Sequence, residues 1–169
     1  FDRCITRGLP GAMMPGFYNH NYHILQTPEH VVLIVEMVHD ARIITLDGRP
    51  HPSPGTQQWM GDSRGHWEGE TLVVVTTNLT DKVSERGATV LGTGAGLRLV
   101  ERFTRVAEDR IDYRFTVEDP TVYTQPWTAV RPMPRLDDYI IYEYACHEGN
   151  YAMTNILTVE RVQESEAGR

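Results

Sequence analysis

The chain has 169 residues, 40% of them hydrophobic, and a formal net charge of -7. This length suits a single domain with a substantial hydrophobic core. The acidic balance and the scattered basic residues argue against a phosphate-binding surface, so nucleic acid is not an expected partner. No apolar run approaches the roughly 20 residues that a membrane-spanning helix needs, and we expect no membrane span.

Glycines and prolines interrupt the first 18 residues, which predict an irregular N-terminal arm. Cys4 lies in this arm and Cys146 lies near the other end of the chain. A bond between them would close a very long loop and restrict the unfolded chain. We therefore expect a disulfide, with two buried free thiols as the alternative.

From residue 19 onward the pattern is typical of antiparallel strands. Residues 22–26 predict a first strand and residues 31–37 its antiparallel partner. The strand pattern continues through the charged stretch 36–42, where alternation would put His39 on the same apolar face as Met37. We therefore expect a lone imidazole in an apolar wall.

The middle of the chain predicts a loop, a hairpin and a second loop. Three prolines exclude a central strand from residues 49–55. Residues 62–77 predict a tight hairpin about Glu68 and Gly69 that ends in a buried strand. Residues 79–96 are polar and glycine-rich, and a strand pattern follows them rather than a helix, so we expect a loop and not a dinucleotide site.

The clearest pattern is a hairpin of residues 97–106 and 111–118, because both arms alternate. Its inward positions are apolar except for Glu101, which predicts a buried carboxylate. After it, residues 123–130 predict an edge strand and residues 131–138 a proline-containing loop.

The C-terminal part predicts a last strand over residues 139–146 and a helix over 151–163. Several β-branched residues make a strand over 154–162 the competing interpretation. Antiparallel strands at hairpin spacing predict a mainly β fold. We expect one antiparallel β-barrel, lipocalin-like in general shape, over residues 19–165 with a short C-terminal helix, and a β-sandwich is the alternative.

Three motifs carry a family resemblance: HDARII at residues 39–44, GDSRGHWEGETLVV at 61–74 and YEYACHEGNY at 142–151. With them the chain resembles, over nearly its whole length, a family of uncharacterised and apparently exported bacterial proteins. The resemblance implies a periplasmic or secreted protein in which this segment is the C-terminal part of a longer precursor. It implies no reaction and no catalytic residue.

Four titratable side chains are the candidate catalytic groups, because one strand parity would bring them together: His39, Glu101, Glu143 and His147. With the other parity of residues 139–147, Glu143 and His147 point to solvent and the group shrinks to His39 and Glu101. An imidazole and a desolvated carboxylate in one cavity would serve as general base and general acid, since burial raises the pKa of a carboxyl group. We therefore expect a pocket-based acid–base enzyme, a lyase, isomerase or hydrolase acting on a small polar or aromatic molecule. The alternative is a satisfied buried pair with a structural role only.

Two further function classes stay open. One is a non-catalytic small-molecule-binding barrel. The other is a domain that recognises carbohydrate or protein through Trp59, Trp67 and Trp127. The enzyme and the binding barrel share an expected cavity lining, namely Asn21, Tyr22, His23, Leu33, Met37, Arg42, Phe103, Tyr113 and Phe115.

A metal site is the remaining candidate, because the histidines outnumber what a core of this size needs and imidazole suits zinc, copper or iron. The ligands would be His39 and His147 with Glu101 or Glu143. The sequence has no His-x-His pair and no Cys/His cluster, so no particular cofactor is expected.

Overall fold

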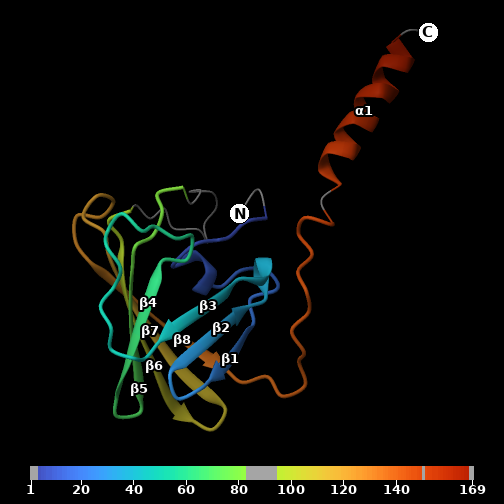
Figure 1. Cartoon of the computed structure of the whole chain (residues 1–169). Coiled ribbons are helices and arrows are strands. Elements are labelled where there is room, and N and C mark those ends of the chain that lie inside the picture. Colours follow the sequence, from blue (N-terminus) through green and yellow to red (C-terminus); the bar gives the residue numbers. More distant parts are fainter. Residues whose placement is uncertain (1–3, 83–94, 150, 168–169) are drawn as a thin grey trace.

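The computed structural model describes residues 4–82, 95–149 and 151–167, and these form one curled sheet followed by a helix (Figure 1). The strands are β1 (Tyr22–Gln26), β2 (His30–Val35), β3 (Ala41–Thr45), β4 (Asp62–Glu68), β5 (Thr71–Thr77), β6 (Arg98–Ala107), β7 (Arg110–Glu118) and β8 (Trp127–Pro134). The helical elements are the 3-10 turns η1 (Gly11–Met13) and η2 (Met37–His39) and the α-helix α1 (Ala152–Ala167).

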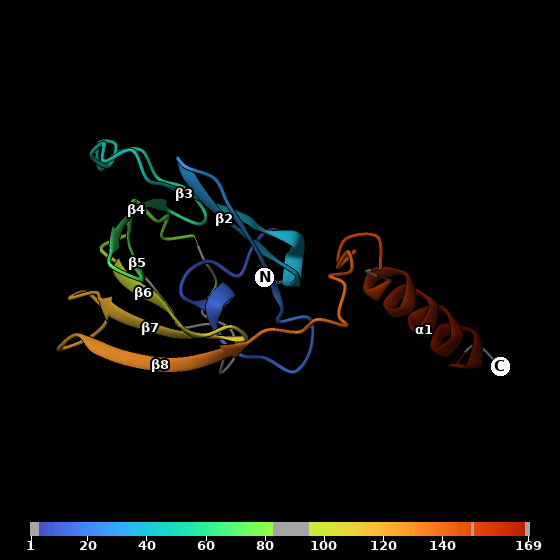
Figure 2. The ribbon, with the colours of Figure 1, turned by 90° about the horizontal axis from the view of Figure 1, so that it is seen from below.

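The strands pair in chain order within a single sheet. Neighbouring strands are antiparallel, except that β3 and β4 run parallel because the long segment 46–61 carries the chain back between them. The sheet curls, but in the described residues its outer strands β1 and β8 do not pair with each other (Figure 2). The prediction of a mainly β, barrel-like fold is therefore confirmed, in the form of a half-barrel made from one sheet rather than a sandwich.

The N-terminal arm fills part of the concave side of this half-barrel. η1 lies within the curve of the sheet (Figure 2), and Leu9, Ala12 and Met13 are at most 1% exposed. These side chains join the inward residues of the strands in one hydrophobic cluster. Removing this apolar surface from water stabilises the open sheet, so the arm belongs to the core.

The β6–β7 hairpin has the predicted parity. Glu101 pairs with Phe115 and Phe103 pairs with Tyr113, and all four side chains are at most 7% exposed. The rings of Phe103 and Tyr113 stack with their centroids 4.7 Å apart. The tight β4–β5 hairpin is confirmed too, with β5 as its buried arm.

The predicted continuous strand through residues 36–42 is wrong. β2 ends and β3 begins within this stretch as its antiparallel neighbour, and η2 turns the chain between them. Val38 and His39 adopt φ values of 65° and 47°. This is the left-handed region of the backbone, which is uncommon for residues other than glycine. Asp40 is the residue with a turn preference in this reversal, and the stretch has no glycine or proline, so the sequence alternates as a single strand would. The reversal leaves His39 exposed and Arg42 buried.

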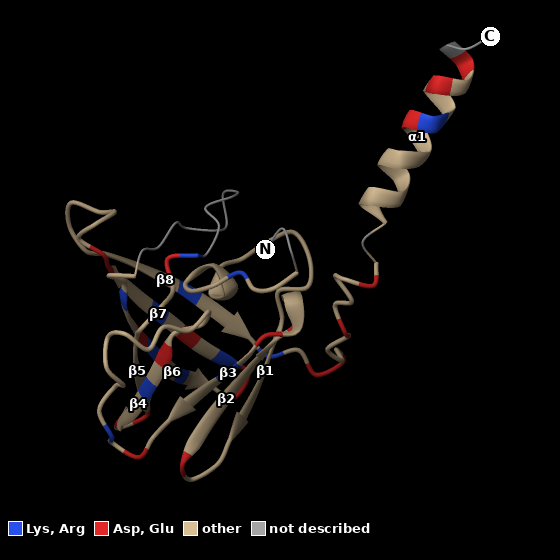
Figure 3. Ribbon diagram, turned by 45° about the horizontal axis from the view of Figure 1, so that its top comes forward, with Lys and Arg blue, Asp and Glu red and all other residues tan. Residues whose placement is uncertain are grey.

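The structure also corrects the chain after β7. β8 extends through residues 131–134, which were predicted as a loop, and its Pro132 and Pro134 occupy exposed positions of an edge strand. The predicted strand over residues 139–146 is wrong, because residues 135–149 form an irregular tail between β8 and α1. Acidic residues outnumber basic ones along this tail (Figure 3).

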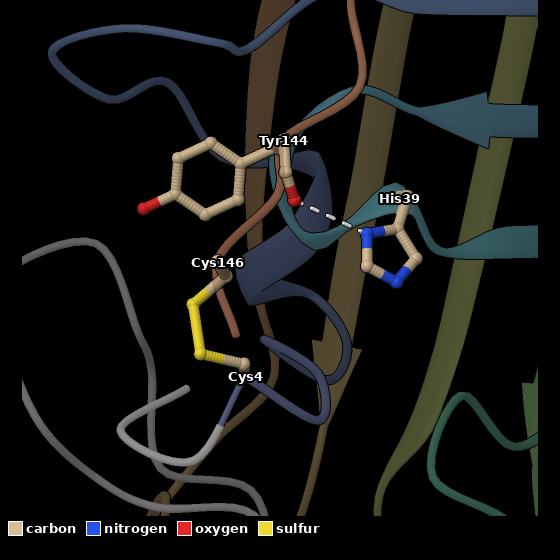
Figure 4. The surroundings of a disulfide bond; sticks show 4 residues. All are labelled: Cys4, His39, Tyr144 and Cys146. Carbon is tan, nitrogen blue, oxygen red and sulfur yellow. Dashed lines mark hydrogen bonds between the residues drawn. A yellow bond between two sulfur atoms is a disulfide. The ribbon is translucent and has the colours of Figure 1, made fainter. Parts of the chain in front are cut away.

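The predicted disulfide between Cys4 and Cys146 is confirmed, with Cα atoms 5.6 Å apart and a sequence separation of 142. It ties the N-terminal arm to the tail. The prediction that Cys146 lies on a barrel strand is wrong. Beside it, the Nδ1 atom of His39 lies 3.2 Å from the carbonyl oxygen of Tyr144 (Figure 4). The tail is thus fastened to the barrel near η2.

Glu36 makes a second attachment for the tail. Its carboxylate is 1% exposed and accepts hydrogen bonds from the Tyr139 hydroxyl at 2.6 Å and the Tyr142 amide at 3.4 Å. Asn21 donates a third hydrogen bond, at 2.7 Å. Burial alone raises the pKa of Glu36, but these hydrogen bonds outweigh it, so the pKa lies below its ordinary value.

Helix α1 confirms the predicted C-terminal helix and excludes the competing strand over residues 154–162. It projects from the half-barrel, and its described side chains are all exposed (Figure 1). Within the described part of the chain, no helix is both long and apolar enough to cross a bilayer. The glycine-rich run 92–96, predicted as a loop, lies largely outside the described residues.

Candidate functional site

A buried polar cluster occupies the inner face of the sheet, formed by Arg42 on β3, Ser63 on β4, Thr76 on β5, Glu101 on β6 and Tyr113 on β7; we call it the Arg42 cluster. Arg42 donates to both carboxylate oxygens of Glu101, with Nη1 2.8 Å from Oε1. It also donates to the hydroxyls of Ser63 and Thr76, at 3.0 and 2.8 Å. Tyr113 donates to Glu101 at 2.7 Å. None of these residues is more than 4% exposed.

The electrostatics of this cluster are internally balanced. Burial lowers the pKa of Arg42, but the charge of Glu101 and the hydrogen bonds to it together raise that pKa by more, so the guanidinium stays protonated. Burial, and then the charge of Glu101, raise the pKa of Tyr113 well above its ordinary value. The buried ion pair is bidentate and hydrogen-bonded to hydroxyls, so it is satisfied without any ligand.

A cavity of ≈ 910 Å³ opens between the unpaired edges of the sheet; we call it the open-side cavity. Strands β1 and β8, the β6–β7 hairpin and residues 135–141 of the tail surround it. Its apolar lining comes from seven strands and includes Ile24, Leu33, Trp67, Leu72, Phe103, Ile111 and Met133. The Arg42 cluster does not line it.

Arg131 and Tyr22 connect the two edges at this cavity. Arg131 Nη1 on β8 donates to the Tyr22 hydroxyl on β1 at 3.2 Å and to the carbonyl of Met13 at 3.1 Å. The Tyr22 hydroxyl in turn donates to the carbonyl of Ala12 at 3.1 Å. Side chains and the N-terminal arm thus join the edges that backbone hydrogen bonds leave open.

His20 also lines the cavity, and its Nε2 atom lies 2.7 Å from Arg7 Nη1. Burial lowers the pKa of His20, and the charge of Arg7 lowers it further, so the imidazole is neutral at pH 7 and accepts a hydrogen bond from Arg7. A Cβ atom at Gly16 would lie 1.8 Å from this Nε2, so only glycine fits beside the ring.

The structure does not bring the four predicted catalytic residues together. Glu101 is fully buried in the Arg42 cluster, whereas His39 is exposed on η2 against the tail (Figure 4). Glu143 and His147 are exposed in the tail. None of the four lines the open-side cavity. His39, Glu143 and His147 lie on segments that are not strands, and Glu101 is on β6 but is enclosed by the Arg42 cluster. Their catalytic role stays a prediction.

The predicted cavity lining divides into two sets. Five of the predicted residues line the open-side cavity: Asn21, Tyr22, His23, Leu33 and Phe103. The others belong to the buried interior and do not line it: Met37, Arg42, Tyr113 and Phe115.

Sequence reasoning missed Arg131 and Met133, which line the cavity from β8. Their signal was present, because residues at alternate positions from Trp127 to Met133 are the less exposed ones. Pro132 and Pro134 concealed this alternation by suggesting a loop. His20 was missed because it precedes β1.

In the described part of the chain, the residues that a metal site or a tryptophan-based recognition surface would need do not form a cluster. Among the described residues, no three histidine, cysteine, aspartate or glutamate side chains lie close enough to hold a metal ion. Trp59 and Trp67 are 40% and 46% exposed, and Trp67 lies at the cavity. Trp127 is half-buried, and its ring packs edge-on against Phe115 at 5.6 Å.

No protein-family model, curated protein or solved structure matches this chain. The resemblance to an exported bacterial family therefore stays a prediction. Function is inferred from the geometry of the protein alone.

Proposed function

We propose that the half-barrel binds a small, largely apolar molecule in the open-side cavity. The observation that carries this proposal is a concave space of ≈ 910 Å³ with apolar side chains from seven strands around it. Small-molecule sites typically have volumes of about 300–1,000 Å³ and a mostly apolar lining with a few polar groups. The polar groups here include Arg131, Tyr22 and His20, and the carboxylates of Glu70, Glu108, Asp109 and Asp137 also line the cavity.

The placement of the acidic and imidazole groups favours binding over acid–base catalysis. Glu101 is fully buried and its charge is engaged by Arg42, so it has no access to a molecule in the cavity. His39 lies on η2, outside the cavity lining. Acid–base chemistry at the cavity would need other residues than those the sequence suggests.

We further propose that the protein works outside the cytoplasm, in the periplasm or after secretion. The disulfide between Cys4 and Cys146 supports this setting, because disulfides persist in oxidising compartments and are rare where thiols are kept reduced.

The test is displacement of an environment-sensitive apolar dye, 1-N-phenylnaphthylamine, by 1-decanol. Met133 faces the cavity from β8, so Met133→Trp should fill part of the space and abolish dye binding. The matched control is Val130→Trp, because Val130 is 59% exposed and lies on the opposite face of the same strand. That variant should bind the dye as the wild type does.

Two outcomes would contradict the proposal. One is saturable dye binding that Met133→Trp leaves unchanged, which would place the dye elsewhere. The other is no binding of dye or decanol by folded wild-type protein.

A further inference from the structure

Arg131 holds a half-buried positive charge at the wall of the open-side cavity. In the described part of the chain it forms no ion pair with a carboxylate. Two other arginines of the cavity do: Arg110 lies 3.5 Å from Asp112, and Arg135 lies 2.6 Å from Asp137. A partly desolvated guanidinium without a counter-charge is costly, so its neighbourhood favours an anion.

The guanidinium also keeps donors available. Nη1 is used by Tyr22 and by the carbonyl of Met13. Within residues 4–82, 95–149 and 151–167, Nε and Nη2 of Arg131 make no hydrogen bond, and neither is among the fully buried atoms. Nε and Nη2 are therefore the unused donors of a side chain that lines the cavity. Nε and one Nη form the pair of parallel donors that binds carboxylate or phosphate oxygens bidentately.

Tyr22 fixes the direction of this side chain. Its hydroxyl accepts from Arg131 and donates to the carbonyl of Ala12, so its position is set by the N-terminal arm. The Arg131 guanidinium carbon lies 5.6 Å from the centroid of the Tyr22 ring. Tyr22 is therefore a positioning residue that holds the donors of Arg131 ready before a ligand arrives.

We propose that the ligand of the open-side cavity is an apolar molecule with one anionic head group, and that Arg131 binds this head. This inference rests on the proposed binding function and specifies its ligand. The apolar body would lie against Leu33, Phe103 and Met133, and a carboxylate or phosphate would meet Nε and Nη2 of Arg131. A cationic head would be repelled by Arg131, and its alternative partners at the cavity are the carboxylates of Glu70, Glu108, Asp109 and Asp137.

The test compares three probes of equal chain length by isothermal titration calorimetry at pH 7: decanoate, 1-decanol and decylamine. Charge-assisted hydrogen bonds predict that the wild type binds decanoate at least about tenfold more tightly than decanol, and decylamine most weakly. Arg131→Met should lose the preference for decanoate while its affinity for decanol stays within about twofold. The matched control is Arg114→Met, which removes an exposed arginine from β7 and should keep the preference.

The outcomes separate the two proposals. If the wild type binds decanoate and decanol equally, the inference about Arg131 is overturned and the binding function stands. If Arg131→Met keeps the preference for decanoate, the inference is likewise overturned. If no probe binds, both are overturned. Should Arg131→Met not fold, Arg131→Lys keeps the charge without the parallel donors and should reduce the preference, and the wild-type comparison remains decisive by itself.

Discussion

Glu101→Gln is the change that most sharply tests how the interior is held together. It replaces a carboxylate of 0% exposure by a neutral amide of the same size, opposite a guanidinium of 2% exposure. Arg42 would keep its hydrogen bonds to Ser63 and Thr76 but lose its counter-charge. Removing one partner of a buried ion pair costs about 3–5 kcal/mol, because a buried charge is left uncompensated.

The loss can be expressed as a melting temperature. An unfolding entropy of about 2.1 cal/mol/K per residue gives about 0.35 kcal/mol/K for 169 residues, so the midpoint should fall by about 9–14 °C. Urea unfolding should report the same loss of free energy. The matched control is Glu68→Gln, which breaks an exposed Glu–Arg pair with Arg102 and should cost less than about 1 kcal/mol.

A double variant, Arg42→Met with Glu101→Leu, removes both charges and should recover at least half of the loss. Because the cluster does not line the cavity, Glu101→Gln should leave decanol affinity unchanged below its melting temperature. If Glu101→Gln costs no more than the exposed control Glu68→Gln, the reasoning about the buried charge is refuted.

Three further changes have defined outcomes. The folded-state pKa of Glu36 is lowered, so its stabilising effect is complete above the unfolded pKa of about 4.3 and is lost as pH falls through the folded value. Glu36→Gln should therefore be less stable than the wild type at pH 7, and the difference in melting temperature should shrink as the pH falls below the folded value. A difference in melting temperature that does not change with pH would exclude this. Replacing Cys4 and Cys146 by serine should cost up to about 5 kcal/mol in urea unfolding, because the bond closes a loop across 142 residues, and a loss below 1 kcal/mol would contradict a restricting role. His39→Asn should change the free energy of unfolding by no more than about 0.5 kcal/mol and leave dye binding unaltered, because the side chain is exposed and asparagine tolerates a positive φ. A loss of about 1–3 kcal/mol in the free energy of unfolding would instead indicate a buried histidine, as the sequence predicts.

Strand alternation carried most of the correct fold prediction. In β6 and β7 every second side chain is apolar and the turn is short, so parity and burial could be derived, including a buried carboxylate at Glu101. The long separation of the two cysteines likewise predicted their bond. These features depend on local pattern or on counting, which a sequence displays directly.

The errors arose where the backbone departs from local preference. The reversal at η2 puts Val38 at a φ of 65°, which its β-branched side chain disfavours, and Asp40 alone is too weak a turn signal to predict it. The tail has a strand-like alternation but no neighbour to pair with, because the sheet ends at β8. Each error changed which side chains were expected to face inward. As a result, His39 and Glu101 were predicted to lie together, whereas His39 is exposed and Glu101 is buried.

The half-open shape itself had no sequence signal either. Whether β1 pairs with β8 depends on the tilt and stagger of all the strands together. The N-terminal arm, which packs on the concave side, was predicted only as an irregular segment. The cavity follows from that opening, so its lining could be predicted only for β1, β2 and β6, whose parity was right.

The central claim is that an apolar molecule binds in the open-side cavity, and methyl NMR of protein labelled at its six methionines tests it most directly. Met133 lines the cavity, Met37 is 3% exposed in the core and Met153 is 67% exposed on α1. On titration with 1-decanol, the Met133 methyl signal should shift saturably while those of Met37 and Met153 stay in place. A saturable shift of Met153 with Met133 unmoved would contradict the claim.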